Sequence, residues 1–181
     1  RSFLYDSNIF KSYKSKIPII SIGNIELGGT GKTPLVIYLS NLLKSHGFKP
    51  GIISRGYKRN SKGRQLISNG LQILMTPLDA GDEPYLLAKS LKNIPVLVDK
   101  NRISGFNYMI NALDVNIIIL DDAFQHRKIN RTIDIVLLNL NTPLNKLNPL
   151  PLGTLRENIS SLYRADILLG TKKNALTKKK N

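Results

Sequence analysis

A glycine-rich segment followed by lysine and threonine is the part of this sequence best suited to chemistry. Glycine permits backbone conformations in which N–H groups close around phosphate oxygens. Lys32 would add a positive charge there, and the hydroxyl of Thr33 would bind the Mg²⁺ that accompanies a nucleoside triphosphate. The segment therefore predicts a nucleotide-phosphate site. Its candidate nucleotide-binding residues are Gly28, Gly29, Thr30, Gly31, Lys32 and Thr33.

The flanking sequence supplies the strand and the helix that such a loop requires. An apolar run at 17–22 predicts a buried strand, and leucines at helical spacing over 33–46, with Pro34 in the first turn, predict a helix. The usual pattern G-x-x-x-x-G-K-[ST] has glycine where this chain has Glu26. A flexible surface turn is the alternative, but it requires neither the strand nor Lys-Thr. Related partitioning-type ATPases carry lysine where this chain has Leu27, which favours kinase chemistry.

Two consecutive aspartates end an apolar run later in the chain. The four apolar residues at 117–120 are followed by Asp121 and Asp122. A carboxylate at the end of such a strand would meet the Mg²⁺ held by Thr33. The run is common by itself, and its combination with the glycine-rich loop gives it meaning. We therefore interpret both aspartates as candidate metal ligands.

Two further segments bring charged residues toward the same edge of a sheet. A strand predicted at 51–55 ends in Arg55, and the short connection from the preceding helix implies a right-handed parallel βαβ unit. Arg55 would then lie at the edge that carries the glycine-rich loop. Asp82 stands just before a helical pattern at 85–91. From its position alone, Asp82 is a helix-capping residue and Pro84 a helix-starting proline.

Strands that alternate with helices predict an α/β fold, namely a P-loop-type, doubly wound and mostly parallel sheet flanked by helices. Asn69-Gly70 between two apolar runs predicts a small β-hairpin near 65–75. The other strands are expected at 95–98, 134–138 and 166–169, with a helix at 101–113.

The composition describes one basic domain. The chain has 181 residues, no cysteine, and 27 Lys and Arg against 12 Asp and Glu, for a net charge of +15. Such a charge suits an anionic partner, for which a phosphorylated substrate, anionic lipid and nucleic acid all qualify, and a solvated lysine-rich surface is the alternative. Aromatic residues rarely interleave with the basic ones, so no nucleic acid is expected. We divide the chain into a basic and aromatic membrane-proximal arm at 1–16, a nucleotide-binding lobe at 17–171 and a lysine-rich tail at 172–181.

Several motifs, taken together and in order, resemble the tetraacyldisaccharide 4′-kinases, the lipid A 4′-kinase family. They run through nearly the whole chain, which makes the set far more specific than a phosphate-binding loop alone. The matching segments are Arg1-Ser-Phe-Leu-Tyr5, 18–34, Ser54-Arg-Gly-Tyr57, Gly81-Asp-Glu-Pro84, Asp121-Asp-Ala-Phe-Gln-His126 and Leu150-Pro-Leu-Gly-Thr-Leu-Arg-Glu157.

The resemblance implies a kinase that uses ATP and Mg²⁺ to phosphorylate the 4′-hydroxyl of a tetraacyldisaccharide 1-phosphate, a lipid A precursor. It implies that Asp82 accepts the proton of the sugar hydroxyl and that Arg55 stabilises phosphoryl charge. Glu83 would be structural. It also implies peripheral association with anionic lipid at the cytoplasmic face of the inner membrane. The metal-binding residues would be Thr33, Asp121, Asp122 and Glu157.

The sequence departs from the family pattern at Glu26, at Ala123 in place of glycine and at Asn158 in place of proline. Family members also begin with a membrane helix and continue into a C-terminal half that carries a histidine thought to assist the aspartate. We therefore expect this chain to be the nucleotide lobe, and whether it is active alone stays open. A regulatory nucleotide-binding module is the alternative reading, and a basic nucleic-acid-binding ATPase is a weaker one.

Overall fold

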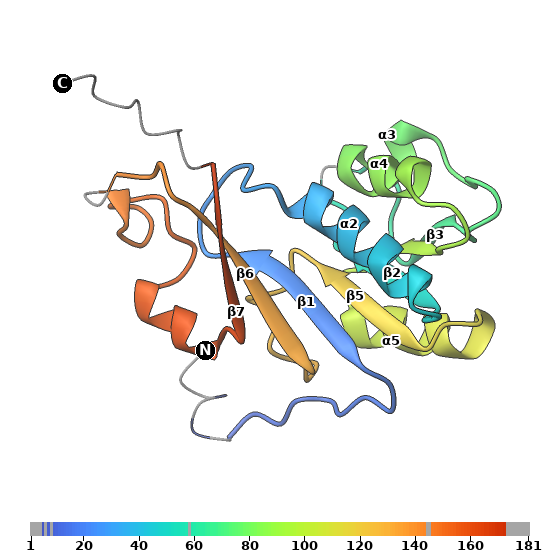
Figure 1. The fold of residues 1–181 in the computed structure, drawn as a ribbon, viewed down its shortest axis with the longest axis horizontal. Helices are drawn as coiled ribbons and strands as arrows, with labels where there is room; N and C mark the ends of the chain where they lie inside the picture. The colour runs from blue at the N-terminus through green and yellow to red at the C-terminus, as the bar shows by residue number, and fades with distance from the viewer. Residues whose placement is uncertain (1–4, 6, 8, 58, 144–145, 173–181) are drawn as a thin grey trace.

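A seven-stranded sheet forms the centre of the molecule in the computed structural model, which describes residues 5, 7, 9–57, 59–143 and 146–172 (Figure 1). The strand order is β3-β4-β2-β5-β1-β6-β7. All neighbouring strands are parallel except β3, which pairs antiparallel with β4. The predicted α/β fold is confirmed. The strands are β1 (Ile19–Asn24), β2 (Pro50–Ser54), β3 (Gln65–Ser68), β4 (Val96–Val98), β5 (Ile117–Asp121), β6 (Ile133–Asn139) and β7 (Ile167–Thr171).

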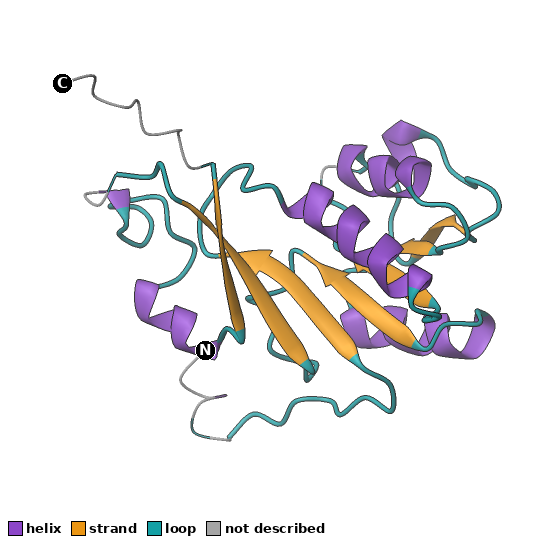
Figure 2. Cartoon of the chain, in the orientation of Figure 1, coloured by secondary structure: helices purple, strands orange, loops and turns teal. Residues whose placement is uncertain are grey.

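Helices cover both faces of the central strands, with α2 in front and α5 behind in the view of Figure 2. This arrangement follows from the sequence, because successive residues of a strand point to opposite faces and the central strands are apolar on both. The helices are α2 (Lys32–Ser45), α3 (Pro77–Ala80), α4 (Asp82–Ser90), α5 (Arg102–Ala112) and the 3₁₀ helix η2 (Ile159–Arg164).

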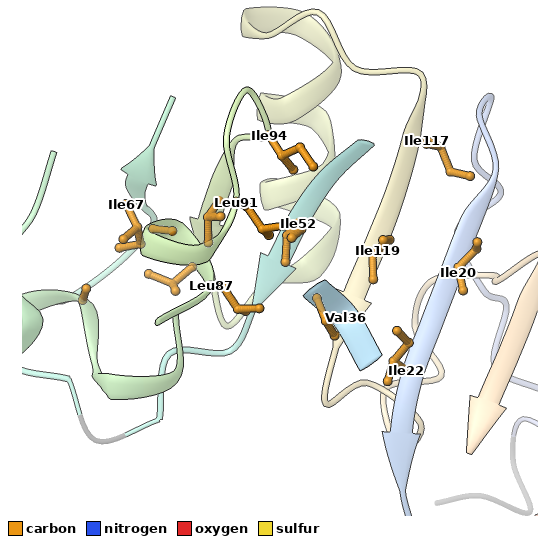
Figure 3. Close-up of a cluster of buried hydrophobic side chains, with 14 of the residues drawn as sticks. Ile20, Ile22, Val36, Ile52, Ile67, Leu87, Leu91, Ile94, Ile117 and Ile119 are labelled. Atoms are coloured by element: carbon orange, nitrogen blue, oxygen red, sulfur yellow. The ribbon is translucent and has the colours of Figure 1, made fainter. Parts of the chain in front are cut away.

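Two hydrophobic clusters lie on the two faces of the sheet. Alternate residues of β1 and β5 divide between them, so that Ile20 packs on the α2 side and Ile19 on the α5 side. Figure 3 shows the first cluster, where Val36 of α2 and Leu87 of α4 lie against strand residues. The central strands, covered on both faces, thus support the loops at the carboxyl edge of the sheet, whereas the edge strand β7 is largely exposed.

The predicted hairpin near 65–75 forms only in part. Its turn is present, because Asn69 Oδ1 accepts hydrogen bonds from the backbone N–H groups of Leu71 and Gln72 at 2.9 and 2.8 Å. The return arm makes one isolated bridge, between Ser68 and Ile73, and is no strand of the sheet. Burial explains the difference, since Leu71 is 82% exposed whereas β3 is held by β4.

The basic arm and tail reach only partly into the described residues. Residues 1–4 of the expected arm, with Arg1, and residues 173–181 of the expected tail lie outside them. Within the described part of the chain, no helix is both long and apolar enough to pass through a bilayer. The exposed residues Ile9 and Phe10 belong to the described part of the arm.

Candidate active site

The glycine-rich loop connects β1 to α2 in a conformation that requires glycine. Gly28 and Gly31 have φ angles of 100° and 86°, a region where a side chain would be strained. Gly31 precedes α2, and among the described residues no side chain caps the first turn of that helix. The first N–H groups of α2 therefore remain available to an anion. The hydroxyl of Thr30 is buried and accepts a hydrogen bond from Asn24 Nδ2 at 3.0 Å, which ties the loop to β1.

Glu26, which departs from the usual glycine pattern, anchors the base of the loop. Its side chain is buried and accepts hydrogen bonds from the backbone N–H of Asn139 at 3.1 Å and from Thr142 Oγ1 at 2.5 Å. The backbone around it pairs with the segment before Glu157, where Arg156 N donates to Ile25 O at 2.6 Å. The Glu26 carboxylate thus serves the scaffold, and the phosphate-binding part of the loop begins after it.

Asp122 lies between two cations at the mouth of the loop. Its Oδ1 atom is 3.3 Å from Lys32 Nζ, and Arg156 Nη1 donates to its two oxygens at 3.0 and 2.9 Å. Burial would raise the pKa of Asp122, but the charges of Lys32 and Arg156 outweigh that effect and hold the pKa below its ordinary value. Asp122 is therefore an ionised carboxylate that orients two cations toward the loop.

Asp121 has the opposite electrostatic character although it is the adjacent residue. Its side chain is 2% exposed, and burial raises its pKa to about 6, against the hydrogen bond that Ser54 Oγ donates to Oδ2 at 3.0 Å. The neighbouring charges of Asp122 and Glu83 raise the pKa further. The ionised form is thus favoured for Asp122, whereas burial favours the protonated form of Asp121.

Beneath this pair lies a buried arginine. Arg102 Nη2 donates to the backbone carbonyl of Asp121 at 3.0 Å, and Nη1 donates to that of Asp99 at 2.6 Å. Burial lowers the pKa of the Arg102 guanidinium to about 10, with Asp121 opposing the shift. Arg102 holds the carboxyl ends of β4 and β5 together under the site, and it supplies positive charge without contacting solvent.

The glycine-rich loop, Lys32, Asp122 and Arg156 border a cleft of about 600 Å³ at the carboxyl edge of the sheet, whereas Asp121 and Arg102 do not line it. Lys32, Arg55 and Arg156 contribute positive charge to it, while Glu83 and Asp122 contribute negative charge. A cleft with backbone N–H groups, cations and a carboxylate in this arrangement suits a polyphosphate and its metal ion. The lining residues are Leu27, Gly28, Gly29, Lys32, Ser54, Arg55, Tyr57, Glu83, Asp122, Gln125 and Arg156.

Comparison with known proteins identifies the family. A family model described as tetraacyldisaccharide-1-P 4′-kinase (LpxK) matches residues 1–181. This chain belongs to that family.

Relatives and a solved structure agree with the family assignment. The tetraacyldisaccharide 4′-kinases of Chlorobaculum parvum and Desulfotalea psychrophila are 45% and 41% identical to the chain, over 95% and 96% of its length. The crystal structure of LpxK from Aquifex aeolicus in complex with ATP superimposes with a TM-score of 0.88 and 42% identity over 94% of this chain. The chain covers 48% and 50% of those two relatives and 53% of that structure, so it spans about half of their length.

Of the acids that the tetraacyldisaccharide 4′-kinase resemblance singles out, Asp82 does not line the cleft, whereas its neighbour Glu83 does. Asp82 is the exposed first residue of α4, directly after Gly81. Gly81 has a φ of 86° and packs so closely that a Cβ there would lie 3.0 Å from the carbonyl oxygen of Tyr57. This contact fixes the start of α4 against the strand end that carries Arg55. The role of Asp82 stays a prediction.

The Glu157 carboxylate, a predicted metal ligand, is paired with an arginine in this structure. It forms an ion pair with Arg164 of η2, whose guanidinium lies 4.5 Å from the centre of the Phe124 ring. Thr33 is in the first turn of α2, and neither residue lines the cleft. Across the described ranges, no three acidic or histidine side chains converge into a protein metal site. The residues present suit Mg²⁺ that receives most of its ligands from a triphosphate and water.

Sequence reasoning assigned no role to Arg156, Arg102 or Gln125. Arg156 lies inside a motif quoted above for the family, and that membership was its only sequence signal. Gln125, whose Nε2 donates to Asn24 O at 2.9 Å, likewise lies in the Asp121–His126 motif. Arg102 carries no signal at all, because a basic residue at the start of a helix is ordinarily exposed. Their importance depends on contacts between distant segments.

Proposed function

We propose that this chain is the nucleotide-binding half of an enzyme that transfers the γ-phosphoryl group of ATP to the 4′-hydroxyl of a tetraacyldisaccharide 1-phosphate, a step of lipid A biosynthesis. The observation that carries the proposal is the cluster of Lys32, Asp122 and Arg156 at the mouth of the glycine-rich loop. Family membership supports the acceptor, and the ATP complex of the Aquifex aeolicus relative supports the donor.

In this proposal each part of the cleft has a role in phosphoryl transfer. The loop and the first turn of α2 bind the phosphates through backbone N–H groups, and Lys32 contributes a charge. Mg²⁺, held by Thr33 with Asp121 and Asp122, would neutralise the phosphate charge. Arg55 and Arg156 border the same space and would stabilise charge on the transferred group.

The proton of the acceptor hydroxyl requires a carboxylate, and α4 supplies two candidates. Asp82 is proposed on the family motif, while Glu83 is the acid that lines the cleft. The test uses a version of the protein extended to the length of its relatives. We expect Asp82→Asn to abolish transfer of radiolabelled phosphate to the disaccharide lipid while the Kd for ATP changes less than twofold. The isosteric Glu83→Gln is the matched control.

The outcomes distinguish Asp82 from Glu83 as the proton acceptor, and a kinase from a regulatory nucleotide-binding module. Loss of transfer in Glu83→Gln alone would assign the proton to Glu83 and remove Asp82 from the mechanism. ATP binding without transfer by the extended protein would favour the regulatory nucleotide-binding module. For the 181-residue chain itself we expect ATP binding with little or no transfer. Robust transfer by this chain would show that the other half of the relatives is dispensable.

We also propose that the protein binds the anionic surface of the inner membrane at its cytoplasmic face. Ile9 and Phe10 are 62% and 44% exposed, and they border a hollow of about 660 Å³ with Lys11 and Lys128. Arg127 lies 5.1 Å from the centre of the Tyr5 ring beside it. Exposed apolar and aromatic groups next to lysines suit a lipid headgroup layer. A membrane-embedded acceptor would then be presented directly to the enzyme.

A further inference from the structure

Glu26 lies where three segments of the candidate site meet. Its carboxylate accepts hydrogen bonds from Asn139 N, at the end of β6, and from Thr142 Oγ1, in the loop that follows β6. Its backbone belongs to the short segment that joins β1 to the glycine-rich loop, and it forms an isolated antiparallel bridge with Leu155. One residue thus connects β6, the base of the phosphate-binding loop and the segment around Leu155.

The segment opposite Glu26 carries Arg156 into the cleft. Arg156 N donates to Ile25 O at 2.6 Å, and Leu27 N donates to Thr154 O at 2.9 Å, so the two backbones are paired on both sides of the bridge. The guanidinium of Arg156 then lies 2.9 Å from Asp122. Its place in the cleft therefore depends on the register between residues 25–27 and residues 154–156.

The loop after β6 holds the same segment from its other side. Thr154 N donates to Lys146 O and Leu155 N donates to Asn148 O, both at 3.0 Å. The fit is tight, because a Cβ on Gly153 would collide with the carbonyl oxygens of Asn148 and Lys146. Residues 154–156 thus lie between the loop after β6 and the base of the phosphate-binding loop, and the Glu26 carboxylate ties these two flanking segments together.

Apolar packing alone does not explain this arrangement. Ile25, Leu155 and Val136 belong to one buried cluster, which holds the segments together. The hydrophobic effect is non-directional, however, and a slip of one residue would turn Arg156 to the opposite face. Glu26 is 4% exposed, and none of the ion pairs among the described residues includes it. A buried carboxylate requires its hydrogen bonds, so these bonds specify the register.

We propose that Glu26 is a positioning residue for phosphoryl transfer, which sets the place of the Arg156 guanidinium in the cleft through the loop after β6. The proposal rests on the proposed function and adds to it a residue at which this chain departs from the family pattern. A charge that stabilises a transferred group must be held within roughly 0.5 Å of its working position. Loss of the Glu26 carboxylate frees the loop after β6, and Arg156 then loses one of the two supports of its backbone.

The first experiment measures amide hydrogen exchange by NMR in the nucleotide-free chain. The reporters are the N–H groups of Leu27 and Arg156, which form the pairing, and the N–H of Ile52 in β2 is the internal reference. The test variant is Glu26→Ala. The control is Ile67→Val, which removes a buried methyl group from β3 at the opposite edge of the sheet and costs about 0.5–1.5 kcal/mol of stability.

We expect Glu26→Ala to accelerate exchange at the Leu27 and Arg156 amides at least tenfold more than at Ile52, because the opening is local. In Ile67→Val the two reporters should change no more than the reference. A uniform acceleration at all three amides in Glu26→Ala would mean that Glu26 contributes only overall stability, and it would overturn the proposal.

The second experiment is a double-mutant cycle on the Kd for ATP–Mg²⁺, measured by calorimetry. Glu26→Ala should raise the Kd about tenfold, and Ile67→Val should leave it within twofold of wild type. Glu26→Gln should restore most of the affinity, because its amide oxygen can accept from Asn139 N and its amide nitrogen can donate to Thr142 Oγ1.

The cycle asks whether Glu26 acts through Arg156. In the Arg156→Ala background, the further change Glu26→Ala should alter the Kd less than twofold, because the group that it positions is already gone. Effects of the two substitutions that simply multiply, or a wild-type Kd in Glu26→Ala, would overturn the proposal. If the wild-type chain binds no ATP, the proposed function fails, and the exchange rates by themselves then decide whether Glu26 positions the Arg156 segment.

Discussion

Replacement of Lys32 by alanine is the most direct test of the nucleotide site. The Lys32 side chain is only 10% exposed, and its Nζ lies 3.3 Å from Asp122 at the mouth of the loop. Two unit charges about 4 Å apart attract each other by roughly 4 kcal/mol at an effective dielectric constant near 20. Desolvation and the existing ion pair with Asp122 offset much of this gross attraction. Net values for hydrogen bonds to charged groups are about 1.5–3 kcal/mol.

We therefore expect Lys32→Ala to raise the Kd for ATP–Mg²⁺ about 10- to 100-fold, since each 1.4 kcal/mol corresponds to a factor of ten. Calorimetry provides the measurement. Because Lys32 is largely shielded from solvent, most of the effect should persist when the salt concentration is raised. Asp122 keeps Arg156 as a partner at 2.9 Å, so the variant should remain folded.

Lys44→Ala is the matched control for this measurement. Lys44 belongs to the same helix, α2, but lies in its last turn, and its Nζ donates to the carbonyl of Lys92 at 2.8 Å. The substitution removes the same charge far from the loop, and its ATP affinity should equal that of wild type. Equal affinity of the Lys32→Ala variant and wild type would refute the assignment of the nucleotide to this loop. An equal loss of ATP affinity in both variants would show that the effect comes from the overall charge of the protein.

Three further outcomes are expected. Burial raises the pKa of Asp121 from 3.8 to about 6, so the native state binds more protons than the unfolded state between these pH values. The free energy of unfolding should therefore fall by on the order of 2–3 kcal/mol as the pH rises from about 4 to 6. Urea denaturation should show a smaller pH-dependent loss for Asp121→Asn, and an identical pH profile would contradict the burial argument. Glu26→Ala removes the acceptor of a backbone N–H and should lower the free energy of unfolding by about 1–3 kcal/mol, and Glu26→Gln should lower it less. Equal stability of wild type and both variants would argue against the anchoring role. Lys11→Ala/Lys14→Ala should weaken the affinity for anionic vesicles, measured by sedimentation, at least tenfold, because each lysine contributes about 1 kcal/mol. Tighter binding of the wild-type protein to RNA than to vesicles at matched salt would favour the nucleic-acid-binding ATPase.

Local sequence was sufficient for the strand, loop and helix at the nucleotide site. The apolar run before the loop, the positive-φ glycines and the first turn of α2 are all specified within a few residues of one another. The same holds for β5 and the aspartates that follow it, because a strand buried on both faces reads as a continuous apolar run. Alternating strands and helices imply a parallel sheet, and in a parallel sheet the carboxyl ends of the strands lie at one edge. The loop and the aspartates are therefore brought to the same edge.

Tertiary structure alone decided which side chains face the cleft. Glu26 looked like a defect in a motif, and its partners Asn139 and Thr142 lie on a distant strand and loop, so only the folded chain reveals an anchor. Glu157 faces Arg164, and α4 turns Glu83 rather than Asp82 into the cleft. A side chain's direction depends on the exact turn of its helix and on the charges packed around it. Those are set by contacts between segments far apart in the chain, which residue type and spacing do not encode.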